Sequence, residues 1–160
     1  MKYFLTTMMI GLLITSNVAA QTPALTIPDF TFFRSDNTPF TNKNISSGNK
    51  IFFIFFDTEC EHCQHAIQYI NQHQEEFAKA AVYLVSVDLK EKVTVFMSKH
   101  GNNLTGKKNI TVLQDSKNQF ILKFSPRKYP SMFLYSPQKK LLLYDDDEKS
   151  LDKFLVKIKT

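Results

Sequence analysis

The chain of 160 residues is 43% hydrophobic and 22% charged, with a formal net charge of +5. This size and balance predict one globular domain, and the low content of glycine and proline excludes a collagen-like or low-complexity chain. The basic residues are mostly lysines scattered along the sequence, so the charge indicates a solvated surface and no nucleic-acid partner.

The first twenty residues have the layout of a secretory signal peptide. Lys2 supplies a positive start, residues 3–14 are largely apolar, and Val18, Ala19 and Ala20 offer small residues at the usual cleavage positions. We therefore predict a signal peptide over residues 1–20 and a mature domain over residues 21–160. The mature chain is expected in the periplasm or secreted, without stable membrane insertion. The alternative is an uncleaved N-terminal anchor, although the apolar run is short for a membrane span.

Strand and helix patterns alternate along the mature chain. Residues 28–33 predict an extended lead-in and residues 38–41 a short return strand. The six consecutive apolar residues 51–56 are typical of a strand buried on both faces. Apolar residues at spacings of three and four then predict a helix from about residue 60 to residue 80. Further strands are expected at 82–87, 111–113, 131–135 and 140–144, and further helices at 91–100, 118–124 and 151–158. This order predicts an α/β fold with a mixed sheet.

The two cysteines, Cys60 and Cys63, come just after the apolar run 51–56, on the first turn of the helix that follows. The unpaired N–H groups and the dipole at a helix N-terminus stabilise a thiolate. With two residues between them, the sulfurs can close into a disulfide across one helical turn. Cys60 is nearer the exposed end and is expected to attack, whereas Cys63 faces the core with Ile67 and is expected to resolve the mixed disulfide.

Three other uses of the cysteine pair compete with redox chemistry. A purely structural disulfide between Cys60 and Cys63 would contribute little, because so small a ring stabilises the folded state by only about 2 kcal/mol in the loop-entropy model. A zinc site needs a second ligand pair, and His65, His73 and His100 offer no partner at the usual spacing, so no metal site is expected. Covalent haem attachment requires a histidine where Gln64 stands. Redox chemistry is therefore favoured.

Two segments carry a family resemblance. Residues 52–63, Phe-Phe-Ile-Phe-Phe-Asp-Thr-Glu-Cys-Glu-His-Cys, resemble the strand, loop and active-site helix of the thioredoxin superfamily. Residues 27–32 and 38–40 resemble the N-terminal extension of its exported TlpA/ResA-like branch. Tyr129-Pro130, ahead of residues 131–135, resembles the cis-proline landmark of that family. The resemblance implies a thioredoxin-like fold, in which a mixed central sheet is flanked by helices and preceded by an N-terminal β extension.

The resemblance also implies a function and a substrate site. It implies an exported thiol–disulfide oxidoreductase in which Cys60 is the nucleophile, Cys63 resolves, and the two form the disulfide. Pro130 is expected to be cis beside the pair, and Tyr129 to present its backbone to the substrate chain. The expected partners are substrate protein thiols or disulfides and an unidentified redox partner; a monomer without a dissociable cofactor is expected.

Two rival functions stay open. One is a redoxin-type thiol peroxidase, with Arg127 as a charge partner for the thiolate, although the PxxxTxxC pattern of peroxiredoxins is missing around Cys60. The other is a non-enzymatic copper-handling module akin to Sco-like proteins, which would use Cys60, Cys63 and a histidine.

Several positions depart from the family pattern. The two places where relatives carry a buried acid hold Ile54 and Ala66, which leaves proton transfer to Glu59, Glu61, Asp57 or water. We expect Glu61 and His62 to tune the redox pair, because a nearby imidazolium favours the Cys60 thiolate and nearby carboxylates oppose it.

The acidic run 145–148 could suggest a cation site. It immediately precedes the last helix, where acids cap the N-terminus and complement the dipole, so we predict capping.

Overall fold

The computed structural model describes residues 22–160, and the predicted signal peptide lies outside this range. Strands and helices alternate along the described chain. The strands are β1 (Thr31–Phe33), β2 (Pro39–Thr41), β3 (Lys50–Phe55), β4 (Ala80–Ser86), β5 (Ile110–Gln114), β6 (Ser131–Tyr135) and β7 (Leu141–Asp145). The helices are α1 (Glu61–Gln72), α2 (Lys90–His100), α3 (Gln119–Phe124) and α4 (Leu151–Lys159), with 3₁₀ turns η1 (Asn42–Asn44) and η2 (Glu148–Ser150).

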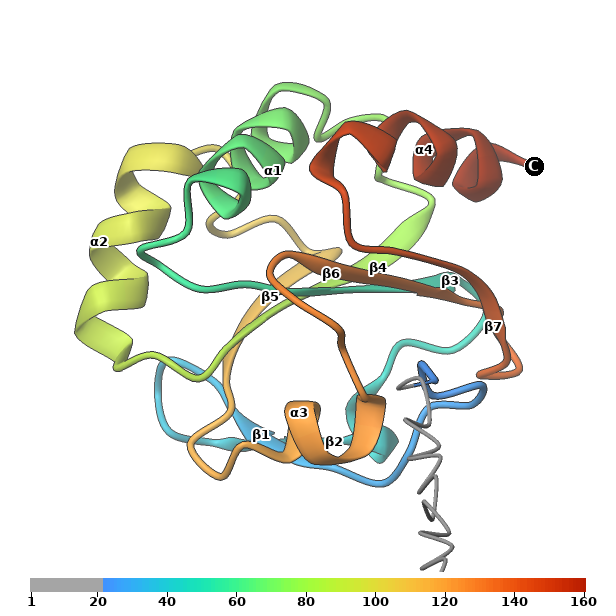
Figure 1. Ribbon diagram of the computed structural model, residues 1–160, viewed down its shortest axis with the longest axis horizontal. Helices are drawn as coiled ribbons and strands as arrows, with labels where there is room; N and C mark the ends of the chain where they lie inside the picture. Colours follow the sequence, from blue (N-terminus) through green and yellow to red (C-terminus); the bar gives the residue numbers. More distant parts are fainter. Residues whose placement is uncertain (1–21) are drawn as a thin grey trace, which may run out of the picture.

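The strands form one mixed sheet in the order β2-β1-β5-β4-β3-β6-β7. The three central strands β3, β4 and β5 run parallel, and β6, β7 and the β1–β2 hairpin are antiparallel to their neighbours. Helices α1, α2 and α4 lie on one side of the central strands, and α3 lies on the other side with the hairpin (Figure 1). The expected α/β class, mixed sheet and N-terminal β extension are confirmed. None of the helices within residues 22–160 combines the length and apolar character that a membrane crossing requires.

Strand β3 is buried on both faces, as its unbroken apolar run predicts. Phe52 and Ile54 of the strand, together with Phe56 directly after it, join the cluster beneath α1, α2 and α4. Its odd-numbered side chains, from Ile51 to Phe55, join a phenylalanine-rich cluster with α3 and the hairpin. The strand is also paired along its length with β4 and β6. Its C-terminal end is therefore fixed, and the cysteine-bearing loop starts from that end.

Helix α1 is shorter than its apolar pattern predicts. It ends at Gln72 with His73 as the C-cap, whereas the sequence predicted a helix to about residue 80. The following residues form turns in which N–H groups bond to the carbonyl three residues back, as from Phe77 to Gln74. Phe77 still reaches the core and stacks on Phe52, with ring centroids 5.7 Å apart. The turn satisfies the same burial requirement, so periodicity alone could not locate the end of the helix.

Gly101 follows α2, as predicted for a C-cap, but its backbone is not in the left-handed region. A Cβ atom at this position would lie 2.6 Å from the Met97 side chain and 3.0 Å from that of Ile67. A larger residue here would therefore require the Met97 side chain to move and would crowd Ile67 of α1.

We predict that Phe53→Ala lowers the free energy of unfolding by about 3–5 kcal/mol, because a fully buried ring is removed and leaves a cavity. The Phe53 ring packs on Tyr83 and Phe124, with centroids 5.1 and 5.3 Å away. Urea unfolding measures the change. The control is Leu122→Ala, at an exposed site on α3, where we expect a change within about 0.5 kcal/mol. Equal effects of the two substitutions would contradict the two-faced core.

Candidate active site

Cys60 is the N-cap of α1, so its side chain lies at the positive end of the helix. Its backbone is extended, and its Sγ accepts a hydrogen bond from the Cys63 N–H at 3.4 Å. Both cysteines are free thiols, and Cys60 is partly exposed. The sulfur therefore faces a backbone N–H donor at the start of the helix, as its position in the sequence predicted.

Cys63 lies one turn deeper and is fully buried. It packs in the cluster that also contains Ala66 and Ile67 from the inner face of α1. Burial raises the pKa of the Cys63 thiol well above its usual range, and a hydrogen bond from the Asp57 backbone opposes this shift. The two thiols thus differ in access to solvent, and the buried Cys63 has a raised pKa.

The loop between β3 and α1 is tied to the end of β4. The Asp88 carboxylate accepts hydrogen bonds from the Thr58 N–H and the Thr58 hydroxyl, both at 2.8 Å, and from the Ser86 hydroxyl at 3.3 Å. Asp57 in turn accepts the Glu59 N–H at 2.8 Å. These bonds hold the backbone that leads into Cys60. Asp88 lies on a separate strand–helix connection, and no local motif in the sequence marked it as part of this site.

The Tyr129-Pro130 peptide bond is cis, as the family resemblance predicted. Pro130 is buried at the start of β6, which pairs with β3. The Tyr129 ring packs on Phe55, with centroids 4.8 Å apart, and burial raises its pKa to about 12 with contributions from Asp57 and Cys63. Tyr129 therefore lies within electrostatic reach of the cysteine pair. Contact between Pro130 and the Cys60 sulfur stays a prediction.

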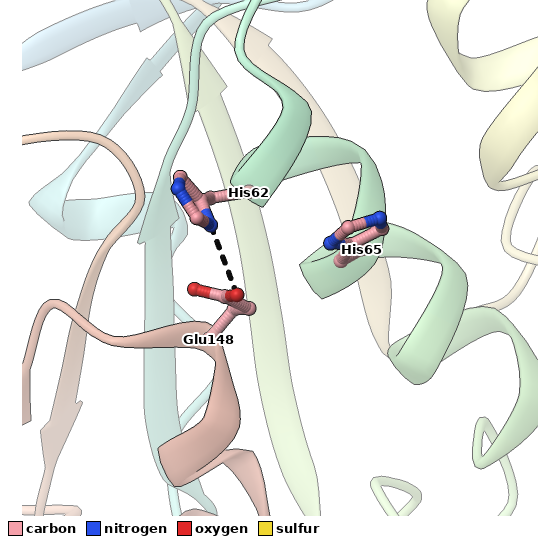
Figure 2. A group of neighbouring side chains, drawn as sticks. All are labelled: His62, His65 and Glu148. Carbon is pink, nitrogen blue, oxygen red and sulfur yellow. Dashed lines mark hydrogen bonds and ion pairs between the residues drawn. The ribbon is translucent and has the colours of Figure 1, made fainter.

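The proposed tuning residues differ in their surroundings. Glu61 is exposed in the first turn of α1. His62 is also exposed, but its Nδ1 lies 3.0 Å from the Glu148 carboxylate, which comes from η2 (Figure 2). The sequence did not indicate this partner, because the two residues are 86 positions apart.

The acids considered as candidates for proton transfer differ in burial and in partners. Ile54 and Ala66, at the positions where relatives carry an acid, are fully buried in the apolar core. Glu59 is exposed and forms an ion pair with Lys92 at 2.7 Å. Among the carboxylates of Asp57, Glu59 and Glu61, that of Asp57 is the one whose charge raises the pKa of both Cys63 and Tyr129.

Residues invoked by the rival functions have other partners. Arg127 pairs with Asp146 at 2.8 Å and lies over the Tyr144 ring. Within residues 22–160, the side-chain group compact enough to hold a metal ion consists of His62, His65 and Glu148 and contains no cysteine. The geometry therefore gives little support to a thiolate–Arg127 pair or to copper held by the cysteines.

Solved structures with the same fold include proteins from two functional groups. A peroxidoxin BcpB from Mycobacterium tuberculosis aligns with a TM-score of 0.70 at 16% identity, over 88% of this chain and 97% of its own. A putative thiol:disulfide interchange protein DsbE from Chlorobium tepidum aligns with a TM-score of 0.69 at 18% identity, over 87% of this chain and 99% of its own. A secreted disulfide oxidoreductase from Mycobacterium tuberculosis gives 0.65 at 15% identity, over 80% and 95%.

These likenesses confirm the thioredoxin-like fold. No curated protein matches the chain. The AhpC/TSA family model matches residues 23–144, which span most of the described domain and include both cysteines and Tyr129-Pro130. The chain belongs to the AhpC/TSA family.

Proposed function

We propose that the chain is an exported thiol–disulfide oxidoreductase that exchanges two electrons with substrate proteins through Cys60 and Cys63. The observation that carries the proposal is the inequality of the two thiols. Cys60 is partly exposed at the start of α1, whereas Cys63 is buried one turn below it with a raised pKa. A nucleophile needs access and thiolate character, and a resolving thiol needs only to reach the first sulfur.

In the reducing direction, the Cys60 thiolate attacks one sulfur of a substrate disulfide. The substrate S–S bond breaks, a mixed disulfide forms, and one substrate thiolate leaves. Cys63 loses its proton and attacks Cys60, which closes the Cys60–Cys63 disulfide and releases the second substrate thiol. The substrate gains two electrons and the cysteine pair loses them; the oxidising direction is the reverse.

The substrate chain is proposed to lie beside Tyr129-Pro130. This segment immediately precedes β6, which pairs with the strand that leads to the cysteines, and the Tyr129 backbone is proposed to pair with substrate backbone. The redox partner is proposed to bind on the same face of the protein, because the substrate and the redox partner must each contact the Cys60 sulfur. The protein is proposed to act as a monomer without a dissociable cofactor.

We predict that Cys63→Ser accumulates mixed disulfides with substrate proteins, because Cys60 still attacks and no thiol resolves the product. Cys60→Ser is expected to trap little and to lose disulfide exchange. Non-reducing gels of both variants, purified from an exporting host, measure the trapping. More trapping by Cys60→Ser would reverse the assignment of the nucleophile, and full activity in both variants would refute the redox function.

In the reduced wild type, we expect iodoacetamide to modify Cys60 at least about tenfold faster than Cys63 at neutral pH. Each unit of pKa changes the thiolate fraction about tenfold, and burial adds to the difference. Mass spectrometry of peptides after timed alkylation gives the two rates. Faster modification of Cys63 would contradict the proposed roles.

Export is proposed from the N-terminal sequence, and a structural neighbour described as secreted supports it. We predict that protein recovered from its native host begins at or near Gln21. Intact mass measurement of the bulk protein decides this. An N-terminus at Met1 would refute cleavage and would favour the uncleaved anchor.

A thiol peroxidase is the second candidate, favoured by the family match and by the peroxidoxin neighbour. In that reaction the Cys60 thiolate would attack a peroxide oxygen, the O–O bond would break, and Cys63 would condense with the sulfenic acid to release water. Under the proposed function, we expect peroxide consumption by the wild type to equal that of Cys60→Ser. Peroxide turnover that depends on Cys60 would instead establish the peroxidase.

A further inference from the structure

Glu148 differs from the other acids in the run 145–148. Asp145 accepts backbone N–H groups and faces Lys153, Asp146 pairs with Arg127, and Asp147 caps η2 by accepting the Lys149 N–H. Asp147 therefore has the predicted capping role, whereas Asp145 and Asp146 form ion pairs that were not predicted. The interaction of the Glu148 carboxylate within residues 22–160 is instead with His62, across to α1.

A second histidine completes a compact group with Glu148. His62 and His65 are three residues apart on α1, so their side chains lie on the same side of the helix, and Glu148 approaches them from η2 (Figure 2). One ligand atom from each of the three residues lies within 4.8 Å of the other two. His65 has no hydrogen-bond or ion-pair partner among the described residues, and its side chain is exposed.

The donor set selects a class of metal. Two imidazole nitrogens and one carboxylate oxygen suit zinc and neighbouring divalent transition metals, whereas calcium and magnesium prefer oxygen ligands. Tetrahedral zinc with bonds of about 2.0–2.1 Å spaces its ligand atoms by about 3.4 Å. The distance from His62 Nδ1 to Glu148 is already 3.0 Å, and the exposed His65 ring is free to rotate toward the pair.

We propose that His62, His65 and Glu148 bind one divalent transition-metal ion of the zinc class, with water completing the coordination. The metal joins α1 to η2 on the exposed surface next to the cysteine pair. Because its ligands include no thiol, the oxidised protein binds the ion as well as the reduced protein does. The ligands are distinct from the two reacting thiols, and the disulfide-exchange predictions rest on Cys60 and Cys63.

The experiment titrates Zn²⁺ into the full-length chain with its cysteines oxidised, at neutral pH, by isothermal calorimetry. We expect one zinc ion per chain. The substitutions His65→Gln and Glu148→Gln should each lower the affinity at least about tenfold, the smallest loss usual even for groups that only support a ligand. Both side chains lie at the surface or near it, and circular dichroism verifies that the variants fold.

The matched control is His73→Gln. His73 is the C-cap of α1, at the opposite end of the helix, and contacts a carboxylate, with its Nδ1 2.6 Å from Glu76, but it has no second histidine in its group. Its replacement should leave the affinity unchanged.

A second readout uses the histidine ring signals of the wild type by NMR. Zn²⁺ should shift those of His62 and His65 and leave those of His73. Unchanged affinity in both His65→Gln and Glu148→Gln would overturn the site. Binding that appears only after the cysteines are reduced would assign the metal to the thiols and would also overturn it.

Discussion

The burial of β3 on both faces and along both edges is the constraint on which the rest of the structure depends. Its side chains alternate between two apolar clusters, and its backbone bonds to β4 on one side and β6 on the other. A one-residue slip would exchange every side chain between the two clusters, so the register is strongly specified. The residue at which the chain leaves the sheet is therefore fixed, and the loop that carries Cys60 starts from a rigid point.

Helix geometry then makes the two cysteines unequal. Cys60 occupies the N-cap, where the chain is still extended and partly exposed, and Cys63 occupies the first turn on the inward face. The same hydrophobic packing that anchors α1 on the sheet buries the second thiol and raises its pKa. The proposed division between an attacking and a resolving sulfur therefore rests on how α1 is anchored.

The surroundings of the pair come from connections far apart in the sequence. Asp88 after β4 holds the loop before Cys60, and Tyr129-Pro130 before β6 lies next to the end of β3. The carboxyl ends of adjacent parallel strands meet at one edge of the sheet, which is the usual place for a site in an open α/β fold. The mixed sheet brings the loop before Cys60, the segment after β4 and Tyr129-Pro130 together. The hydrogen bonds of Asp88 then hold the loop before Cys60 in place.

The sequence by itself determined the class of fold, the order of its strands and helices, and the location of the thiol pair. These follow from local patterns: an apolar run, helical spacing, and two cysteines at a helix start. It could not place the end of α1, because a turn buries Phe77 as well as a helix would. It also could not join His62 and His65 to Glu148 or Thr58 to Asp88, because these contacts link residues on different elements. Only tertiary packing decides which side chains meet across such a separation, since local propensity carries no information about distance in space.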